Sequence, residues 1–313
     1  MKGKVLITEQ VSQKGIDFLI DKGYEIVFPK GKDEDSLIEA AKDCEAILVR
    51  ILPISKKLID SCPNLKVIAK HGVGVDNIDL EACRAKGIKV VNTPGANSRS
   101  VAEYTMALIL SCAKQIPKMA SAYKNGNLKA KDSTSFVEIS GKTLGVLGLG
   151  KIGREVANMA SKGFGMKVLV YDPFIKSLDL DFTLVEDKDE IFKEADYISI
   201  HSPLTEDTRH SVGKREFDLM KETAYLVNCS RGPIINEDEL IEALKNKKIA
   251  GAGLDVTEKE PLDPSSELFK LENVIVTNHI AATTKEAMDE MVLRAARGLD
   301  DVLESREPEY LIK

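Results

Sequence analysis

The sequence has few cysteines and histidines, and none of them has the spacing of a metal site. Its five cysteines are an odd number without a CxxC pair, namely Cys44, Cys62, Cys83, Cys112 and Cys229. No two of the four histidines lie at HxxxH spacing. We therefore expect reduced thiols in a cytoplasmic protein, with neither a disulfide framework nor a metal ion.

Long hydrophobic runs and an excess of positive charge are also absent. No apolar run approaches the roughly 18 residues of a membrane span, and residues 1–8 run directly into a strand-like pattern that differs from a signal peptide. The net charge of −6 argues against a surface for nucleic acid or anionic lipid. We expect no nucleic-acid partner and no membrane partner.

What is present is a regular alternation of strand-like and helical patterns over 313 residues, enough for about two domains. Such alternation is typical of α/β domains with parallel sheets. Strands are expected in the first third at 5–8, 25–28, 46–49, 67–70 and 89–92, and helices at 10–22, 33–43, 56–61 and 80–86. Later strands are expected at 143–147, 168–171, 197–201, 224–228, 253–256 and 274–277. Each half could form an independent doubly wound sheet.

Two longer segments have helical periodicity. Residues 98–124 predict one helix, with Asn97 or Ser98 as its N-cap and a kink at Pro117. Residues 284–304 predict a second long helix near the end of the chain.

The stretch from Thr143 to Asp172 is the most informative. It places three glycines, Gly148, Gly150 and Gly153, between an expected strand and an expected helix. In a dinucleotide-binding loop the first glycine permits the tight turn, and the second lets the backbone approach a pyrophosphate. The third lets the helix pack closely on the strand. The N-terminus of the helix then stabilises the phosphates.

Asp172 closes the next expected strand, about 20 residues further on, where an acidic residue binds the adenine ribose. Its carboxylate would accept hydrogen bonds from the ribose diol and repel a 2′-phosphate, so it predicts NAD rather than NADP. A glycine turn in an ordinary α/β domain is the competing interpretation. The strand, the third glycine and the acidic residue together favour the dinucleotide site.

Three polar residues follow later strands, at the edge where open α/β sheets bind ligands. They are Arg231, Glu260 and His279. Hydride transfer to or from a hydroxy acid needs a group that moves a proton near neutral pH, and histidine is suited to this. A carboxylate beside it fixes its tautomer, and a guanidinium binds a substrate carboxylate bidentately. Each residue alone could be an ordinary surface or turn residue; their joint placement favours a catalytic set.

With these motifs in place, the chain resembles the D-isomer-specific 2-hydroxyacid dehydrogenases, and within them most closely the 3-phosphoglycerate dehydrogenases. The resemblance extends from about Ala46 to about Arg297. It rests on five ordered blocks: HGVGVDN at 71–77, NTPGAN at 92–97, GLGKIG at 148–153, NCSRG at 228–232 and GLDV at 253–256.

The resemblance implies roles for individual residues. Arg231 becomes the substrate-binding arginine, and Glu260 and His279 become the acid–base pair. The further cofactor contacts it implies, from pyrophosphate to adenosine to nicotinamide, are Lys151 and Ile152, Pro203 and Thr208, and Cys229 and Asp255. The backbone of Val73 and Gly74 would receive the substrate carboxylate.

The resemblance also implies a Rossmann-type nucleotide domain inserted into a flavodoxin-like substrate domain. We expect an NAD-binding domain over residues 97–284 and a discontinuous substrate-binding domain of residues 1–96 plus 285–313. A homodimer built around the nucleotide domain is implied as well. Because the sequence stops at Lys313, we expect no added regulatory domain and no feedback control by serine.

The activity expected is hydride transfer between NAD and a small D-2-hydroxy or 2-keto acid, first of all 3-phosphoglycerate/3-phosphohydroxypyruvate of serine biosynthesis. The phosphate needs a second cationic site, and Arg50 and Lys70 follow strands of the first third; ordinary surface cations are the alternative. Other hydroxyacid dehydrogenases, such as a glyoxylate/hydroxypyruvate reductase, remain possible. So does an NAD-sensing, corepressor-like interaction protein.

Three details leave the geometry open. Asn278 stands where the family commonly has proline, and Ala281 where it commonly has glycine, so His279 could be shifted or the nicotinamide crowded. His71, beside the Val73–Gly74 loop, could help to bind an anion or simply pack in the interior.

Overall fold

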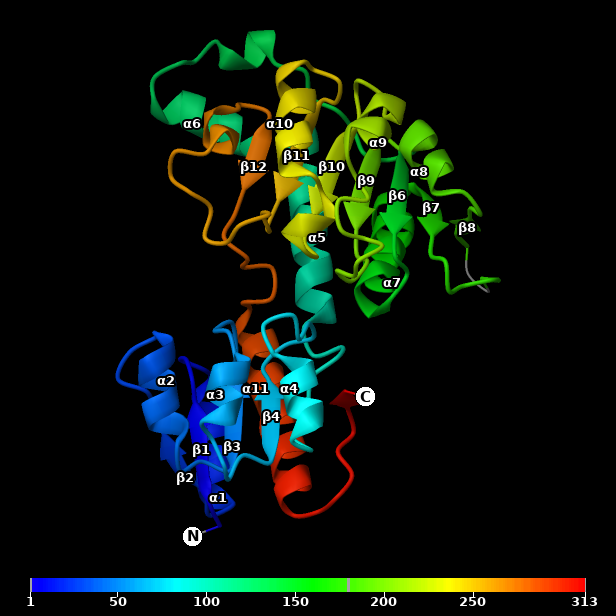
Figure 1. Ribbon diagram of the computed structural model, residues 1–313. Helices are drawn as coiled ribbons and strands as arrows, with labels where there is room; N and C mark the ends of the chain where they lie inside the picture. The colour runs from blue at the N-terminus through cyan, green and yellow to red at the C-terminus, as the bar shows by residue number, and fades with distance from the viewer. Residues whose placement is uncertain (1, 179–180, 313) are drawn as a thin grey trace. The chain divides into compact units, whose positions relative to one another are not determined.

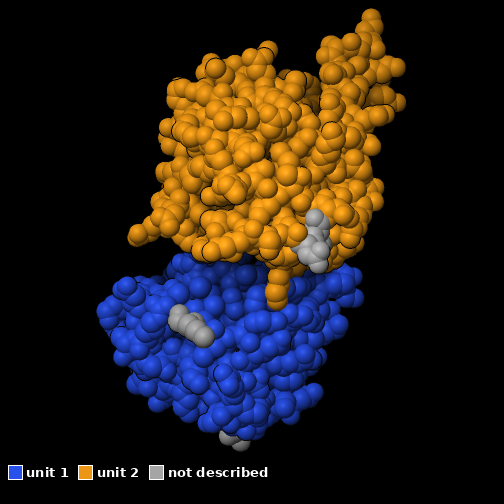
Figure 2. Space-filling view, turned by 90° about the vertical axis from the view of Figure 1, so that its right-hand side faces the viewer, with its two compact units in different colours: residues 1–97, 283–313 blue, residues 98–282 orange. Residues whose placement is uncertain are grey.

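The computed structural model describes residues 2–178 and 181–312 (Figure 1). The chain forms two compact units, unit 1 from residues 1–97 and 283–313 and unit 2 from residues 98–282 (Figure 2). Unit 2 is therefore an insertion in unit 1, and each unit is built on a largely parallel sheet. The expected α/β class, one doubly wound domain inserted into another, is confirmed.

Unit 1 has a six-stranded sheet in the order β13-β5-β4-β3-β1-β2. Its strands are β1 (Lys4–Ile7), β2 (Glu25–Val27), β3 (Ala46–Val49), β4 (Val67–Lys70), β5 (Lys89–Val91) and β13 (Leu311–Ile312). Its helices are α1 (Gln13–Asp21), α2 (Glu34–Ala41), α3 (Lys56–Asp60), α4 (Leu80–Ala85) and α11 (Lys285–Leu303). The five parallel strands have the order of flavodoxin-like sheets. The unexpected β13 pairs antiparallel with β5.

The strands of unit 1 are apolar without alternation because helices cover both faces of the sheet. Val5 and Ile7 of β1 belong to a core with α1 and α11, which includes Leu19 and Val292. Leu6, between them, points to the other face, into a core with α2, α3 and α4.

Unit 2 has a seven-stranded parallel sheet in the order β12-β11-β10-β9-β6-β7-β8. Its strands are β6 (Thr143–Leu147), β7 (Lys167–Tyr171), β8 (Thr183–Leu184), β9 (Tyr197–Ile200), β10 (Tyr225–Asn228), β11 (Gly251–Leu254) and β12 (Val274–Val276). The order reverses beside β6, as in Rossmann-type sheets. β11 begins and ends two residues earlier than expected, so Asp255 lies in the loop that follows it.

The helices of unit 2 include one correction. They are α5 (Ser98–Lys114), α6 (Ile116–Lys124), α7 (Lys151–Asn158), α8 (Lys188–Glu194), α9 (Lys214–Leu219) and α10 (Glu237–Lys245). The expected single helix over 98–124 is wrong: α5 and α6 are separated by Gln115, whose φ is +49°. Pro117 lies in the first turn of α6, where no N–H is needed, instead of kinking a continuous helix.

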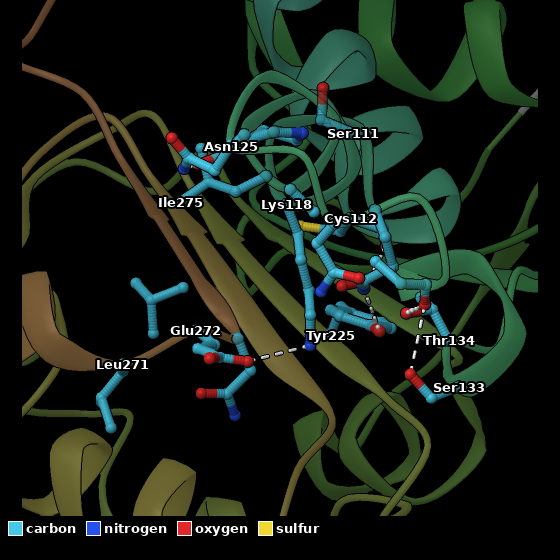
Figure 3. Close-up of a pocket in the computed structure, with 18 residues that line it drawn as sticks. Ser111, Cys112, Lys118, Asn125, Ser133, Thr134, Tyr225, Leu271, Glu272 and Ile275 are labelled. Atoms are coloured by element: carbon cyan, nitrogen blue, oxygen red, sulfur yellow. Dashed lines mark hydrogen bonds and ion pairs between the residues drawn. The ribbon is translucent and has the colours of Figure 1, made fainter.

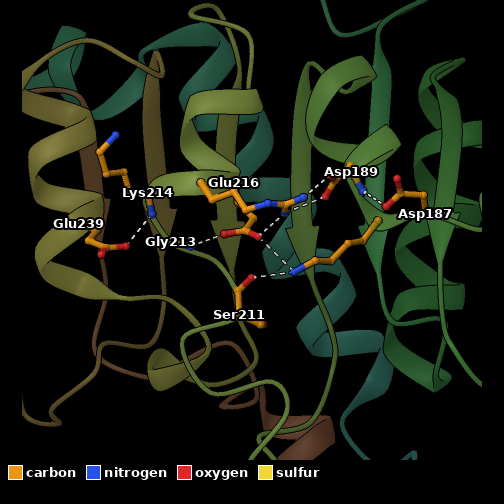
Figure 4. A network of polar contacts seen from close by, with 9 residues as sticks. Asp187, Asp189, Ser211, Gly213, Lys214, Glu216 and Glu239 are labelled. Atoms are coloured by element: carbon orange, nitrogen blue, oxygen red, sulfur yellow. Dashed lines mark hydrogen bonds and ion pairs between the residues drawn. The ribbon is translucent and has the colours of Figure 1, made fainter.

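A polar network joins α8 to α9 (Figure 4). Burial alone would raise the pKa of Glu216. The hydrogen bond from the Gly213 amide and the contact with Lys188 outweigh it, so the pKa lies below its usual value. Arg215 pairs with Asp189 in the first turn of α8. The network ties together two helices on one face of the sheet.

Candidate active site

The loop between β6 and α7 requires glycine at two positions because backbone atoms approach it closely. At Gly148 φ is +94°, and a Cβ atom would lie 2.8 Å from the amide nitrogen of Ser202. At Gly153 a Cβ atom would lie 2.1 Å from the carbonyl oxygen of Gly148. Both glycines therefore shape the turn from strand to helix.

Gly150 differs because the space beside it is open. It is the N-cap of α7, and a Cβ atom there would meet no atom of the described residues within 4 Å. Lys151 and Ile152 follow it, and the first N–H groups of a helix have no acceptor within the helix. Open space, amide donors and the positive end of the helix dipole fit a dinucleotide pyrophosphate.

Asp172 lies directly after β7, beside the same loop. Its carboxylate accepts the N–H of Leu149 at 2.8 Å through one oxygen and that of Phe174 at 3.0 Å through the other. Each oxygen keeps a further lone pair for a ribose hydroxyl. A ribose diol fits this carboxylate, whereas a 2′-phosphate would meet its negative charge.

The loop after β9 contains the two expected adenosine contacts. The Thr208 hydroxyl donates to the carbonyl oxygen of Pro203 at 2.7 Å and accepts the N–H of Thr205 at 2.7 Å. The Thr208 side chain therefore shapes this loop. Contact of Pro203 and Thr208 with adenosine stays a prediction.

His279 and Glu260 form a hydrogen-bonded pair, with 2.8 Å between Nδ1 and a carboxylate oxygen. His279 follows β12 with a φ of +56°, and its N–H donates to the carbonyl oxygen of Asp255 at 2.7 Å. The other Glu260 oxygen accepts the N–H of Thr257 at 3.4 Å. Because Nδ1 faces the carboxylate, Nε2 is the ring nitrogen that can exchange a proton with a ligand.

Asp255 is buried and holds the loop that carries His279. One of its carboxylate oxygens accepts from the Thr277 hydroxyl at 2.7 Å and from the Ile280 N–H at 2.9 Å. The other accepts from the Ala281 N–H at 2.8 Å. The sequence interpretation placed Asp255 at the nicotinamide and missed this internal role, because its partners lie on the segment that follows β12.

Arg231 lies on a segment that packs backbone to backbone against the segment of Glu260. A Cβ atom at Gly232 would lie 1.9 Å from the carbonyl oxygen of Thr257. The buried Asn228, at the end of β10, donates to the carbonyl oxygen of Arg231 at 2.9 Å. Asn228 escaped the sequence interpretation, although a polar residue ending an apolar strand is a usable signal.

In unit 1, Arg50 and Lys70 lie at the carboxyl ends of β3 and β4, where the sequence places them. The Lys70 ammonium donates to the carbonyl oxygen of Arg50 and to Oδ1 of Asn77, the latter at 2.6 Å. The Arg50 guanidinium donates to the carbonyl oxygen of Gln10 at 3.4 Å. Lys70 therefore hydrogen-bonds within unit 1, and binding of an anion by Arg50 and Lys70 stays a prediction.

The loop after β4 is partly exposed and has backbone donors without a backbone acceptor among the described residues. Val73 is 37% exposed, and within residues 2–178 and 181–312 the N–H groups of Val73 and Gly74 have no backbone acceptor. Burial, together with the smaller effect of the nearby positive charge of Arg50, lowers the pKa of His71 to about 4. His71 is thus neutral at pH 7, which favours packing over anion binding. The N–H groups of Val73 and Gly74 are therefore the hydrogen-bond donors in this loop that are suited to an anion.

Comparison with known proteins identifies the family. Residues 106–281, more than half of the chain, match the family model for the NAD binding domain of D-isomer specific 2-hydroxyacid dehydrogenases. The chain belongs to the D-isomer-specific 2-hydroxyacid dehydrogenase family. Unit 2 is therefore the NAD-binding domain of this family, and the expected dinucleotide cofactor is confirmed.

Relatives within the family carry different substrate names. A D-3-phosphoglycerate dehydrogenase of Methanocaldococcus jannaschii is 44% identical over 288 residues, which are 91% of this chain but 54% of the relative. A glyoxylate reductase of Thermococcus litoralis is 40% identical over 311 residues, covering 96% of this chain and 93% of the relative. A crystal structure of a Thermus thermophilus protein has a TM-score of 0.92 at 34% identity, covering 99% of this chain and 100% of that one. The chain thus spans about half the length of the phosphoglycerate dehydrogenase.

With Asn278 and Ala281 in place of the common proline and glycine, the hydrogen bond between His279 and Glu260 is still formed. Ala281 is buried in the main core of unit 2, and its carbonyl oxygen accepts from the Ser100 hydroxyl at 2.6 Å. Asn278 is exposed.

Burial raises the pKa of Cys229 to about 12, so its thiol is protonated and is not a nucleophile at neutral pH.

Other binding features are few among the described residues. No cluster of three or more metal-ligating side chains occurs in 2–178 and 181–312. Among the helices in these ranges, none is both long and apolar enough to cross a bilayer. A pocket of about 530 Å³ lies at the amino-terminal ends of β10 and β12, beside α6 (Figure 3). Lys118 and Glu272, paired at 3.0 Å, lie on its wall. The glycine loop and His279 follow strand carboxyl ends, so the pocket is at the other edge of the sheet.

Proposed function

We propose that the protein is an NAD-dependent oxidoreductase that transfers a hydride between the nicotinamide and carbon 2 of a small D-2-hydroxy or 2-keto acid. The observation that carries this proposal is the Glu260–His279 pair, at 2.8 Å, in the same unit as the open glycine loop. When bound, NADH supplies the hydride. Family membership supports the same reaction class.

The proton is handled by the chain itself. In the reductive direction, protonated His279 donates a proton from Nε2 to the carbonyl oxygen of the keto acid as the alcohol forms. Glu260, at Nδ1, fixes the tautomer and stabilises the protonated ring. Arg231 binds the carboxylate of the substrate bidentately and holds carbon 2 in place.

The cofactor contacts follow the sequence of the dinucleotide. The pyrophosphate binds at the loop and helix start, residues Gly148, Gly150, Lys151, Ile152 and Gly153. Asp172 binds the adenine ribose and disfavours a 2′-phosphate, so NADH is preferred over NADPH. For the remaining contacts we propose Pro203 and Thr208 at adenosine, and Cys229 and Asp255 at the nicotinamide end, where Asp255 also acts by holding its loop.

Within this class we propose 3-phosphohydroxypyruvate, with 3-phosphoglycerate as its reduced partner, as the substrate. Unit 1 acts as the substrate-binding domain, in which Arg50 binds the phosphate and the amides of Val73 and Gly74 bind the carboxylate. Those amides have no backbone acceptor within the described residues, which supports this role. Similar relatives named for phosphoglycerate and for glyoxylate make a glyoxylate/hydroxypyruvate reductase the second candidate.

A substrate panel tests the proposal. Purified protein is assayed for oxidation of NADH and of NADPH with 3-phosphohydroxypyruvate, hydroxypyruvate and glyoxylate. We expect the highest kcat/KM with NADH and the phosphorylated acid. A preference for glyoxylate would favour the second candidate, a glyoxylate/hydroxypyruvate reductase. Equal use of NADPH would show that Asp172 does not discriminate against a 2′-phosphate. NADH binding without turnover of any acid would point to a sensor.

We also propose that unit 2 forms a homodimer. α6 and the residues after it extend away from the sheet (Figure 1) and expose Tyr123 and Leu128, at 73% and 64%. We place the contact between protomers at these side chains, because apolar surface exposed in a contiguous patch is typical of a protein contact. Light scattering on wild type should give twice the chain mass of 34.3 kDa. Tyr123→Glu/Leu128→Glu should be monomeric, and Ile20→Glu, an exposed apolar control in unit 1, should not. A monomeric wild type would refute the dimer.

A further inference from the structure

One carboxylate oxygen holds the loop that carries Arg50. The N–H groups of Arg50, Ile51 and Leu52 donate to Oε2 of Glu9 at 3.0, 2.7 and 3.1 Å. The hydroxyl of Thr8 donates to the same oxygen at 3.2 Å. Consecutive amides that converge in this way form an anion-binding nest. Here the chain fills the nest with its own side chain.

The carbonyl side of the loop is held as well. Lys70 donates to the carbonyl oxygen of Arg50, and Nδ2 of Asn77 donates to that of Leu52 at 2.7 Å. Lys70 and Asn77 are themselves joined at 2.6 Å. We call Glu9, Lys70 and Asn77 the loop clamp. Together they bond the backbone of residues 50–52 from both sides, entirely within unit 1.

Arg50 is the charged side chain on this clamped loop. Its guanidinium makes one long hydrogen bond, 3.4 Å, to a carbonyl oxygen, and it forms no ion pair within residues 2–178 and 181–312. The charge is therefore available to an anion, while the backbone below it is fixed. A positively charged group held in this way binds an anion with less loss of conformational entropy than one on a mobile loop.

We propose that Glu9 is a specificity-determining positioning residue, which holds the loop so that Arg50 meets the phosphate of the substrate. The inference rests on the proposed function, since it acts through the phosphate role of Arg50. The sequence suggested that Lys70 binds the phosphate itself. In this proposal Lys70 instead holds the loop of residues 50–52 at the carbonyl oxygen of Arg50.

The test compares two substrates that differ in the phosphate, 3-phosphohydroxypyruvate and hydroxypyruvate. In Glu9→Ala we expect the ratio of their kcat/KM values to fall by about 10-fold, mostly through KM of the phosphorylated acid. Glu9→Gln keeps an acceptor oxygen and should fall between wild type and Glu9→Ala. Glu39→Ala removes an exposed carboxylate from α2 of the same unit and should leave the ratio unchanged. If Glu9 had only a structural role, Glu9→Ala would lower kcat/KM for both substrates by the same factor.

A double-mutant cycle shows whether Glu9 acts through Arg50. Adding Glu9→Ala to Arg50→Ala should not lower the ratio further. If Arg50→Ala lowers the ratio and neither Glu9 variant does, the role of Glu9 is overturned and the substrate assignment stands. If Arg50→Ala leaves the ratio unchanged, both fail. We also expect faster hydrogen exchange at the amides of residues 50–52 in Glu9→Ala. Unchanged protection would show that Glu9 does not hold this loop, whichever substrate the enzyme uses.

Discussion

The first strands of the two units end in opposite ways. After β6, the chain turns through Gly148 and Gly150 and leaves the first amides of α7 beside open space. After β1, Glu9 places its carboxylate on the amides of residues 50–52. Both loops lie at the carboxyl edge of a parallel sheet, where ligands bind in this architecture. At its glycine loop, unit 2 thus leaves backbone donors beside open space, whereas at the loop of residues 50–52 unit 1 satisfies its backbone internally, and in our proposal recognition there falls to the side chain of Arg50.

The largest expected effect tests whether proton transfer depends on unit 2 alone. His279→Ala should lower kcat by about 10²–10⁴-fold, the usual contribution of general acid–base catalysis. NADH affinity, measured by fluorescence titration, should be unchanged because the glycine loop is intact. A loss of kcat below tenfold would show that another group moves the proton.

Glu260→Gln serves as the companion variant, because it removes the charge but keeps the size of the side chain. In wild type, keto-acid reduction should fall as pH rises and the protonated ring is lost. Without the carboxylate that stabilises the protonated ring, this fall should shift to lower pH. An unmoved pH profile would exclude Glu260 from the proton relay.

The next effect tests how completely unit 1 encloses its own polar groups. Buried His71 has its pKa lowered from 6.5 to about 4, so the folded state binds fewer protons than the unfolded state between these values. The stability that depends on neutral His71 is present above pH 6.5 and is lost as pH falls towards 4. Between pH 7 and pH 4.5 the loss should be about 2–3 kcal/mol. The free energy of unfolding, measured by urea denaturation at several pH values, should decrease more steeply with falling pH in wild type than in His71→Gln. The same pH dependence in both proteins would contradict the buried neutral state of His71.

A smaller effect tests recognition by a side chain in unit 1. A charged hydrogen bond contributes about 1.5–3 kcal/mol, so Arg50→Ala should lower kcat/KM for 3-phosphohydroxypyruvate by roughly 10- to 150-fold. Glyoxylate, which has no phosphate, should lose far less. Equal losses for both acids would mean that Arg50 does not read the phosphate.

The smallest effect tests recognition by backbone in unit 2. Gly150→Ala places a methyl group in open space, so the protein should fold normally while NADH binds about 10-fold more weakly. Gly163→Ala also meets no described atom within 4 Å and is the matched control, with unchanged NADH affinity. If both variants bind NADH like wild type, the pyrophosphate does not lie against Gly150.

The contrast between the loops also explains what the sequence could predict. Gly148 and Gly153 are recognisable because the close approach of the backbone demands a residue type. The strands ahead of Glu260 and His279 placed those residues at one sheet edge, and the structure shows them in contact. The partners of Glu9 and Asp255 lie on segments that are distant in the sequence and meet only in the fold, so no local pattern reveals them.

The helix break shows the same limit on a smaller scale. Pro117 was visible, but the interruption falls at Gln115, a left-handed residue between α5 and α6, and Pro117 lies in the first turn of α6. Proline is compatible both with a kink and with a helix start. Periodicity alone does not distinguish the two, because the apolar pattern continues across the break.

Gly232 leaves no room for a side chain between its own backbone and that of Thr257 and Glu258. The segment with Arg231 and the segment with Glu260 therefore shift together or not at all. In evolutionary terms, a substitution that moves the backbone near Glu260 would also move the backbone near Arg231, so we expect unit 2 to have few independent routes to a new substrate. The loop of residues 50–52 can change one side chain at a time, and we expect the family to diversify its substrates there while inheriting its chemistry unchanged.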